Sequence, residues 1–347
     1  MLSNTQKEIY NATDDKIVVI AAPASGKTRL LTEKVKKAIE DNEGRIVVIT
    51  FTNAAAEEMS KRIGEKAKDM FIGTIHSYAN YLLLSNGIDT NEYIQEEQFD
   101  ELFELIRENR NMIEKVDYLF LDEAQDSTET QFEFILDMIN PRKFFIVADH
   151  RQSIYGWNGG RPDILIDLTM EPDVVTYNLH ENFRNGQNIL EFARRLIRPL
   201  GPKYYDTSTW KSGIDGMVVE MDYRIPTLIK YIEQNAQYGK WFILTRTNSE
   251  LDAVYTALEN REIPCESFKR AELDATELNK KLENDTVKVL TIHTAKGLEN
   301  DYVAVIGARF YNPEERRIAY VAATRAKKML LWIRPPKKKQ AKTFSWE

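Results

Sequence analysis

Residues 17–28, IVVIAAPASGKT, constrain this chain more than any other segment, because an apolar run typical of a buried strand leads directly into Gly26, Lys27 and Thr28. A strand, a tight turn and a helix start in this order predict a phosphate-binding loop. Backbone N–H groups of such a loop surround a polyphosphate, the lysine reaches its terminal oxygens, and the threonine hydroxyl holds Mg²⁺. Because Ala21 replaces the first glycine of the GxxxxGK[ST] pattern, a chance match is the alternative, and residues elsewhere decide between the two.

Size and composition predict a soluble protein with two domains. A chain of 347 residues is too long for one ordinary core. Its longest apolar runs, residues 17–22 and 46–51, are far shorter than the roughly 20 residues of a membrane helix, and no signal-peptide pattern precedes them. The single Cys265 excludes an internal disulfide and suits a reducing compartment. We therefore expect a cytoplasmic protein with no membrane partner.

Charge is unevenly distributed along the chain. A formal net charge of −7 argues, taken alone, against a nucleic-acid partner, because phosphate backbones attract basic surfaces. Acidic residues are concentrated in residues 92–114, whereas residues 334–342 are basic. For residues 335–347 we favour a basic disordered tail over a functional contact with nucleic acid.

Short β-type runs alternate with helical patterns such as residues 54–68, which predicts an α/β fold with parallel sheets flanked by helices. We expect strands of a first series at residues 17–22, 45–50, 70–73, 118–121 and 144–148. We expect a second series at residues 216–221, 241–245, 287–292, 302–306 and 329–333. Residues 199–216 read as a loop-rich junction, and we find no internal sequence repeat.

Asp122 and Glu123 follow the predicted strand 118–121 at its carboxyl end. Ligands of open parallel sheets bind at that edge. In a P-loop enzyme one carboxylate there holds Mg²⁺ and the next polarises the attacking water. An acidic surface turn is the alternative for the pair alone. Together with the Lys27 loop, the pair favours nucleotide hydrolysis.

Seven further segments carry polar or aromatic residues in an informative order: LSNTQ (2–6), TFTNAAA (50–56), GTIHS (73–77), ADHRQSIYGW (148–157), NFR (182–184), VLTIHTAKGLE (289–299) and ERRIAYVAATRAK (315–327). With the loop, they resemble the motifs of superfamily 1 helicases of the UvrD/Rep type over nearly the whole chain. The resemblance implies two RecA-like P-loop NTPase domains, residues 1–180 and 181–334, with a short helical insertion near residues 78–115. It also implies an ATP hydrolase that uses ATP and Mg²⁺ and moves 3′ to 5′ on DNA.

The resemblance also assigns the nucleotide site. Gln6 would read the adenine edge, Arg29 and Phe183 would flank the base, Glu299 would hold the ribose, and Gly297 would lie near phosphate. The catalytic residues would be Lys27, Asp122, Glu123, Gln152, Arg184 and Arg325, with Thr28 and Asp122 as Mg²⁺ ligands. The nucleotide-binding residues of the loop itself would be Ala22, Pro23, Ala24, Ser25, Gly26, Lys27 and Thr28. Relatives usually have glycine at Ala22 and Ala24, where each methyl group restricts φ and crowds phosphate.

Single-stranded or tailed duplex DNA is the implied substrate. The implied contacts are Phe51, Thr52, Asn53, Thr74, His76, Tyr155, Trp157, Arg246, Thr291 and His293. Trp157 lies in a polar loop and is a poor core residue, so we favour base stacking, worth about 1 to 3 kcal/mol per base. Phe51 could instead belong to the core, and His76 and His293 could be structural.

Two functional hypotheses remain. The first is a DNA-dependent ATPase that acts as a translocase or helicase, in which ATP bound to Lys27 on one domain and to Arg184 and Arg325 on the other draws the domains together. The second is a nucleotide-gated DNA-binding or switch protein with little motor activity. Only a short acidic segment and residues 268–286 stand where larger relatives insert accessory domains, which favours translocation over processive unwinding. No nuclease motif is visible; protein partners and oligomeric state stay open, and a monomer is compatible with the sequence.

Overall fold

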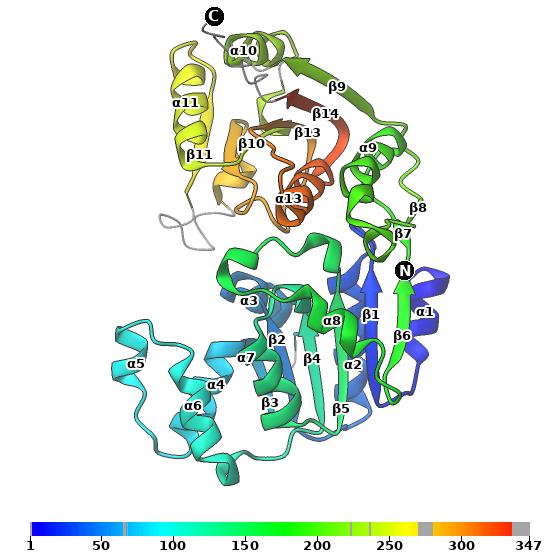
Figure 1. The fold of residues 1–347 in the computed structure, drawn as a ribbon, viewed down its shortest axis with the longest axis vertical. Helices are drawn as coiled ribbons and strands as arrows, with labels where there is room; N and C mark the ends of the chain where they lie inside the picture. Colours follow the sequence, from blue (N-terminus) through cyan, green and yellow to red (C-terminus); the bar gives the residue numbers. More distant parts are fainter. Residues whose placement is uncertain are drawn as a thin grey trace, which may run out of the picture. The chain divides into compact units, whose positions relative to one another are not determined.

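The computed structural model describes residues 2–64, 67, 69–222, 224–235, 237–269 and 280–334, and the predicted tail, residues 335–347, lies outside them. The chain forms two compact units (Figure 1). The first holds the chain up to Phe183 together with Gly201–Lys211, and the second holds Arg184–Leu200 and the chain from Ser212 on.

A six-stranded parallel sheet, in the order β3-β2-β4-β5-β1-β6, forms the centre of the first unit (Figure 1). Its strands are β1 (Lys16–Ala21), β2 (Ile46–Thr50), β3 (Met70–Thr74), β4 (Tyr118–Asp122), β5 (Lys143–Ala148) and β6 (Val175–Leu179). Because the strands are parallel, their carboxyl ends lie along one edge of the sheet.

Helices cover both faces of this sheet. They are α1 (Asn4–Asn11), α2 (Lys27–Glu40), α3 (Asn53–Ile63), α4 (Ile75–Ser85), α5 (Asn91–Gln95), α6 (Glu101–Glu108), α7 (Glu129–Glu133), a π-helix (Phe134–Ile139) and α8 (Pro162–Leu168). Ile17 and Val19 pack with α1, α2 and α3, whereas Val18 packs with the core on the α4 side. Strands buried on both faces explain the nearly continuous apolar runs of the sequence.

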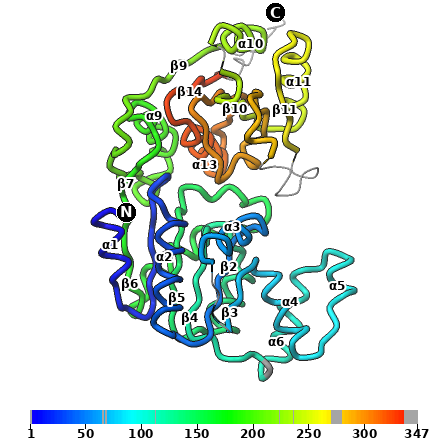
Figure 2. The backbone as a smooth tube through the Cα atoms, turned by 180° about the vertical axis from the view of Figure 1, so that it is seen from behind, coloured from blue at the N-terminus to red at the C-terminus, as the bar shows by residue number. Residues whose placement is uncertain are grey.

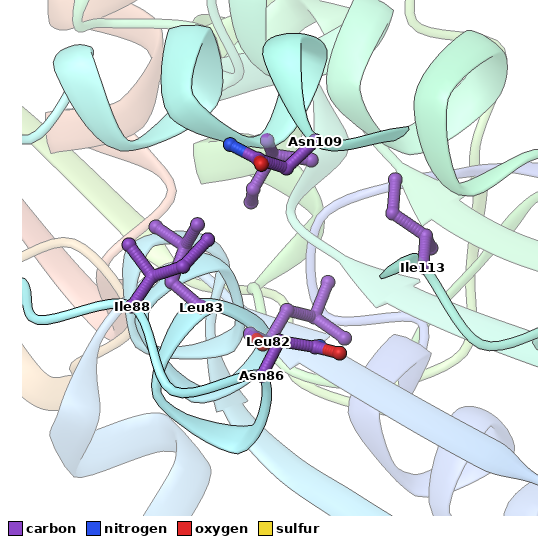
Figure 3. A pocket seen from close by; sticks show the side chains of 7 residues that line it. Leu82, Leu83, Asn86, Ile88, Asn109 and Ile113 are labelled. Atoms are coloured by element: carbon purple, nitrogen blue, oxygen red, sulfur yellow. Dashed lines mark hydrogen bonds between the residues drawn. The ribbon is translucent and has the colours of Figure 1, made fainter. Parts of the chain in front are cut away.

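The helices α4 to α6 lie beyond the β3 side of the sheet in both views (Figures 1 and 2). This segment covers most of residues 78–115, where the sequence predicts a short helical insertion, and Leu82, Phe103 and Ile106 join it to the main core. A gap of about 10 Å³ between α4 and α6 is lined mainly by apolar side chains, among them Ile88 and Ile113 (Figure 3). This volume is at the lower limit for one water molecule, so it is a packing defect and not a ligand site.

The second unit contains another six-stranded parallel sheet, in the order β11-β12-β10-β13-β14-β9. Its strands are β9 (Met217–Asp222), β10 (Trp241–Thr245), β11 (Cys265–Phe268), β12 (Val287–Thr291), β13 (Asn300–Ile306) and β14 (Ala326–Arg334). Its helices include α9 (Gln187–Ile197), α10 (Ile225–Gln234), α11 (Asn248–Glu259) and α13 (Pro313–Ala323). The α10 and α11 helices pack on one face of the sheet, where Leu228 and Leu251 meet Ile243.

All ten predicted strands are present, but three details differ from the sequence expectation. The helix expected over residues 54–68 ends at Ile63, because Gly64 adopts a φ of 80°. The strands β6 and β11 were not expected. Residues 201–211 group with the first unit, since β8 (Thr209–Trp210) pairs with β7 (Glu181–Asn182). No helix in the described part of the chain has the length and apolar character needed to cross a bilayer.

Candidate nucleotide and nucleic-acid sites

The predicted site residues of the first unit follow the carboxyl ends of five adjacent strands. The phosphate-binding loop follows β1, Phe51 follows β2, Thr74 ends β3, Asp122 ends β4, and Gln152 lies in the segment after β5. This is the edge at which open parallel sheets bind ligands. The sheet order therefore brings together segments that are more than 120 residues apart in the sequence.

The loop between β1 and α2 has a conformation suited to an anion. Gly26, with a φ of 80°, precedes the first turn of α2, so the N-terminus of a 14-residue helix faces the loop. Ala24 also has a positive φ, of 57°. The hydroxyl of Ser25 is buried and has no hydrogen-bond partner among the described residues, which leaves it available to a phosphate oxygen. The loop therefore fits the nucleotide that the sequence implies.

Lys27 and Thr28 face the two carboxylates of β4. Lys27 Nζ lies 2.9 Å from a Glu123 oxygen, and the Thr28 hydroxyl donates a 3.0 Å hydrogen bond to Asp122. Burial, together with the nearby charge of Glu123, raises the pKa of Asp122 to about 6. A hydroxyl beside a buried carboxylate is an oxygen donor pair that suits Mg²⁺, which takes few protein ligands and keeps water and phosphate oxygens for the rest.

A buried network joins Glu123 to the end of β5. The Gln125 side-chain amide donates to Glu123 and accepts a 2.9 Å hydrogen bond from the backbone N–H of Asp149. Asp149 in turn accepts from Arg151 Nε at 2.6 Å and from Gln152 Nε2 at 2.7 Å. Burial alone would raise the pKa of Asp149, but Arg151 and Lys27 outweigh it and hold that pKa below its usual value. Gln152, predicted to sense the γ-phosphate, is thus oriented by a carboxylate.

The residues predicted to contact adenine lie around the loop with different exposures. Gln6 is buried, its amide nitrogen donates to Ser25 O at 2.8 Å, and its amide oxygen caps α1 by accepting from Ser3 N at 2.9 Å. Arg29 and Phe183 are exposed. Gln6 therefore supports the loop backbone directly, and its contact with adenine stays a prediction.

Three aromatic residues predicted to contact DNA are brought together in the first unit. The rings of Phe51 and Tyr155 have centroids 4.8 Å apart, and those of Tyr155 and Trp157 are 6.3 Å apart. Trp157 is 66% exposed, whereas Tyr155 is buried beneath it. Next to this aromatic row (Phe51, Tyr155 and Trp157), Thr52 caps α3 and Asn53 is exposed. Such a platform suits unpaired bases.

His76 is placed differently. Its ring lies between Phe99 and Phe103, with centroid distances of 5.2 and 5.5 Å, and burial lowers its pKa. It therefore contacts the insertion, and its DNA contact stays a prediction. Thr74, two residues earlier, caps α4 through a 3.3 Å hydrogen bond from Ser77 N.

In the second unit, the predicted residues Arg184, Glu299 and Arg325 lie together. Glu299 accepts from Arg184 and forms a 2.9 Å ion pair with Lys327. Burial opposes ionisation of Glu299, but these cations lower its pKa overall. Arg325 is 3% exposed, with its guanidinium nitrogens 3.0 Å from Val321 O and 3.4 Å from Leu298 O. Gly297, near Glu299, is exposed with a φ of 85°.

The other predicted DNA contacts of the second unit follow two adjacent strands. Arg246 follows β10 and forms a bidentate ion pair with Glu315, in which guanidinium nitrogens lie 2.8 to 3.2 Å from the carboxylate oxygens. Thr291 ends β12, its hydroxyl lies 2.9 Å from that of Thr294, and His293 is in the turn that follows. Any phosphate contact by Arg246 would compete with Glu315.

Both units use the same short motifs at these positions, although the sequence as a whole shows no internal repeat. The sequence T-x-T-N follows β2 at Thr50 and β10 at Thr245, and in each case the first threonine hydroxyl donates to the carbonyl two residues on, at 3.0 and 3.1 Å. The sequence T-I-H begins at Thr74 after β3 and at Thr291 after β12. Two such motifs are too short to stand out in the sequence without the matching sheet orders.

Sequence reasoning missed several residues that hold the site. Asp149 was detectable, because it follows a predicted strand at the same edge as Asp122. Asn182 and Lys327 lie inside motifs noted in the sequence but were given no role of their own. Gln125 and Asn185 carried no signal, since a polar residue near a motif is ordinarily exposed.

A P-loop beside strand-end carboxylates, on a parallel sheet followed by a second parallel sheet that carries arginines, defines the class of protein: a P-loop NTPase with two RecA-like domains. Residues 2–112 and 100–173 match the UvrD/REP helicase N-terminal domain, and residues 267–334 match the UvrD-like helicase C-terminal domain. The chain belongs to the UvrD/Rep-type superfamily 1 helicase family.

Similar proteins include the ATP-dependent DNA helicase PcrA of Staphylococcus epidermidis, which is 24% identical over 374 residues, 76% of this chain and 50% of the relative. A probable DNA helicase II homolog of Mycoplasma capricolum is 23% identical, over 76% of this chain and 51% of the relative. A probable DNA helicase of Mycoplasma pneumoniae is 27% identical, over 75% and 51%. This chain spans about half the length of these relatives.

Proposed function

We propose that this chain is an ATP-driven motor that moves along single-stranded DNA. The observation that carries the proposal is the pairing of Lys27 with Glu123 and of Thr28 with Asp122 beneath a loop shaped for phosphate. These four side chains are of the kinds that nucleotide hydrolysis by a P-loop enzyme uses. The family of the chain supports the same activity.

Each residue has a defined part in the proposed hydrolysis. Lys27 would bind the terminal phosphates, and Thr28 and Asp122 would hold Mg²⁺, which neutralises charge on the β- and γ-phosphates. Glu123 would accept the proton of the attacking water after Lys27 exchanges its ion pair with Glu123 for one with phosphate.

Residues farther from the loop complete the proposed site. Gln152, oriented by Asp149, would sense the γ-phosphate. Arg184 and Arg325, from the second unit, would neutralise the charge that develops on the leaving phosphoryl group.

DNA would lie on the aromatic row of the first unit and on the threonine motifs of the second. The exposed face of Trp157 supports stacking without base selectivity, which a moving protein needs. From the family we propose 3′ to 5′ movement, with single-stranded or tailed duplex DNA as the substrate.

An ATPase assay with and without a single-stranded oligonucleotide tests the proposal. We expect turnover to rise many-fold with DNA and to be lost in Lys27→Ala. Trp157→Ala should weaken the DNA stimulation, whereas Tyr81→Ala, which removes an exposed ring on α4 outside the aromatic row, should not. If DNA leaves the rate unchanged, the protein is not a DNA-driven motor.

Movement itself separates the motor from a nucleotide-gated switch. An oligonucleotide carrying streptavidin at its 5′ end should lose it rapidly with ATP, and one blocked at its 3′ end should not. A switch would displace neither, and the opposite preference would overturn the proposed direction. Unwinding of a tailed duplex then distinguishes a helicase from a translocase.

A further inference from the structure

The chain passes from the first unit to the second between Phe183 and Arg184, and residues on both sides of this point hold parts of the proposed ATP site. Within the first unit, the fully buried Asn182 side chain donates a 3.0 Å hydrogen bond to Pro23 O, and Phe183 N donates to Ala24 O at 3.2 Å. The backbone of the phosphate-binding loop is therefore fastened to the end of that unit.

Within the second unit, the equally buried Asn185 holds the segment that carries Arg325. Its side-chain nitrogen donates to Thr324 O at 2.9 Å and to Ala326 O at 2.6 Å, the carbonyls on either side of the arginine. Gly186 N adds a 2.9 Å hydrogen bond to Lys327 O. The backbone around Arg325 is thus fixed to the start of that unit.

The two asparagines are three residues apart, no more than about 11 Å of extended chain. A second passage of the chain runs beside them, since Lys211 N donates to Asn182 O at 2.9 Å and the Ser212 hydroxyl donates to Asn185 O at 2.7 Å. Because this connection is short and held by buried hydrogen bonds at both ends, a displacement of the backbone at one end should displace the backbone at the other.

We propose that Asn182 and Asn185 form a clamp that couples the conformation of the phosphate-binding loop to the position of the Arg325 segment. Both are positioning residues. When phosphate enters the loop and Pro23 and Ala24 move, residues 182–186 transmit the movement to the backbone that carries Arg325. This inference rests on the proposed function, because it assumes that the loop binds a nucleotide.

Amide hydrogen exchange tests the clamp without DNA. A non-hydrolysable ATP analogue with Mg²⁺ should slow exchange in a peptide that covers Thr324 to Lys327 of the wild type. In Asn182→Ala this protection should fall to less than half while the analogue still binds. If Arg325 responds only by direct contact with phosphate, Asn182→Ala keeps the full protection and the clamp is wrong.

A second test measures kcat for ATP in single and double variants, because a purely structural role of the two asparagines would not give the non-additive pattern expected here. Each of Asn182→Ala and Asn185→Ala should lower kcat for ATP about tenfold, and the double variant should be no slower than either one, because residues that act in series are not additive. Independent roles would instead give about a hundredfold loss. Asn188→Ala is the matched control. The exposed side chain of Asn188 donates to Gly216 O at 2.9 Å, the backbone hydrogen bond from its N–H to Asp215 O is kept in the variant, and kcat should equal that of the wild type.

Two further measurements keep the outcomes separate. Should an alanine variant fail to fold in thermal unfolding, Asn182→Asp or Asn185→Asp replaces it, because aspartate has the same shape and lacks the donating nitrogen. If the wild type does not bind the analogue, the proposed function fails and the clamp fails with it. If the wild type binds and hydrolyses ATP but the clamp variants behave like Asn188→Ala, only the clamp is overturned.

Discussion

At the scale of single residues, Ala24 is the most informative position of the phosphate-binding loop. The sequence raised it as an alanine where glycine is usual, and the structure gives it a φ of 57°, in the left-handed region that an L-residue enters at a cost of roughly 1 kcal/mol or more. The hydrogen bond from Phe183 N to Ala24 O helps hold this conformation. Ala22, by contrast, is buried, has no positive φ, and bonds Leu179 O through its N–H at 2.8 Å.

The two alanines should therefore respond oppositely to glycine. Ala24→Gly relieves the strain and should raise the free energy of unfolding by up to about 1 kcal/mol, after the greater chain entropy of glycine is subtracted. Ala22→Gly should lower it by about 1 kcal/mol or more, because the chain entropy of glycine and the loss of a buried methyl group both act against the folded state. Urea unfolding of both variants measures the difference, and equal destabilisation by the two would show that Ala24 is not strained.

Glu123 should be needed for hydrolysis and not for nucleotide binding. Glu123→Gln keeps the side-chain shape but removes the base and weakens the 2.9 Å pair with Lys27. We expect kcat for ATP to fall by about 10² to 10³, with binding of a fluorescent ATP analogue retained. Glu129→Gln, at an exposed surface ion pair with Arg161, is the control and should hydrolyse ATP normally. A Glu123→Gln protein with full turnover would remove Glu123 from the catalytic residues.

At the scale of elements, α1 matters because it carries Gln6 to the loop, and Lys34 of α2 fastens it there. Lys34 Nζ lies 3.0 Å from Tyr10 O and 2.5 Å from Ala12 O, at the end of α1. The side chain is 5% exposed, and burial, with the nearby charge of Lys37, lowers its pKa to about 8. The amine thus acts chiefly as a hydrogen-bond donor to helix-end carbonyls.

This lowered pKa makes stability depend on pH in a defined direction. Between about pH 8 and the unfolded value of about 10.4, the unfolded chain keeps a proton on Lys34 that the folded chain has released. The free energy of unfolding should therefore rise with pH in this window, by no more than about 1.4 kcal/mol per pH unit. Lys34→Met lacks the group, so the stability of the wild type relative to the variant should increase from pH 7.5 to 10 in urea titrations. A constant difference would mean that the pKa is not lowered.

The elements also show what the sequence could and could not predict. The strands β1, β2, β4 and β5 were predicted because two-sided burial makes them continuously apolar. The strand β6 was not, since four of its five residues are exposed or half-buried and its sequence, VTYNL, lacks an apolar run. The pairing of β7 with β8, which gives residues 201–211 to the first unit, depends on contacts between segments that carry no local pattern.

At the scale of the whole molecule, motif order was enough to predict two parallel sheets and the residues at their carboxyl edges. It could not predict the ion pairs that these residues form: Glu123 with Lys27, Glu299 with Arg184, and Arg246 with Glu315. Each of these ion pairs joins a residue that we assign to ATP or DNA with a counter-charge from the same unit. Under the proposed function, ATP or DNA would compete with these ion pairs.

The arginines of the second unit give the last test, because they belong to a different unit from the loop. Arg184→Ala should lower kcat for ATP by about 10³, with nucleotide affinity changed far less, since the phosphate-binding loop is intact. Arg195→Ala, an exposed arginine of α9 in the same unit, is the matched control and should leave kcat unchanged. Steady-state turnover and analogue binding measure the two effects. A loss of affinity without a loss of kcat would make Arg184 a binding residue, and the second unit would then have no part in the chemical step through this arginine.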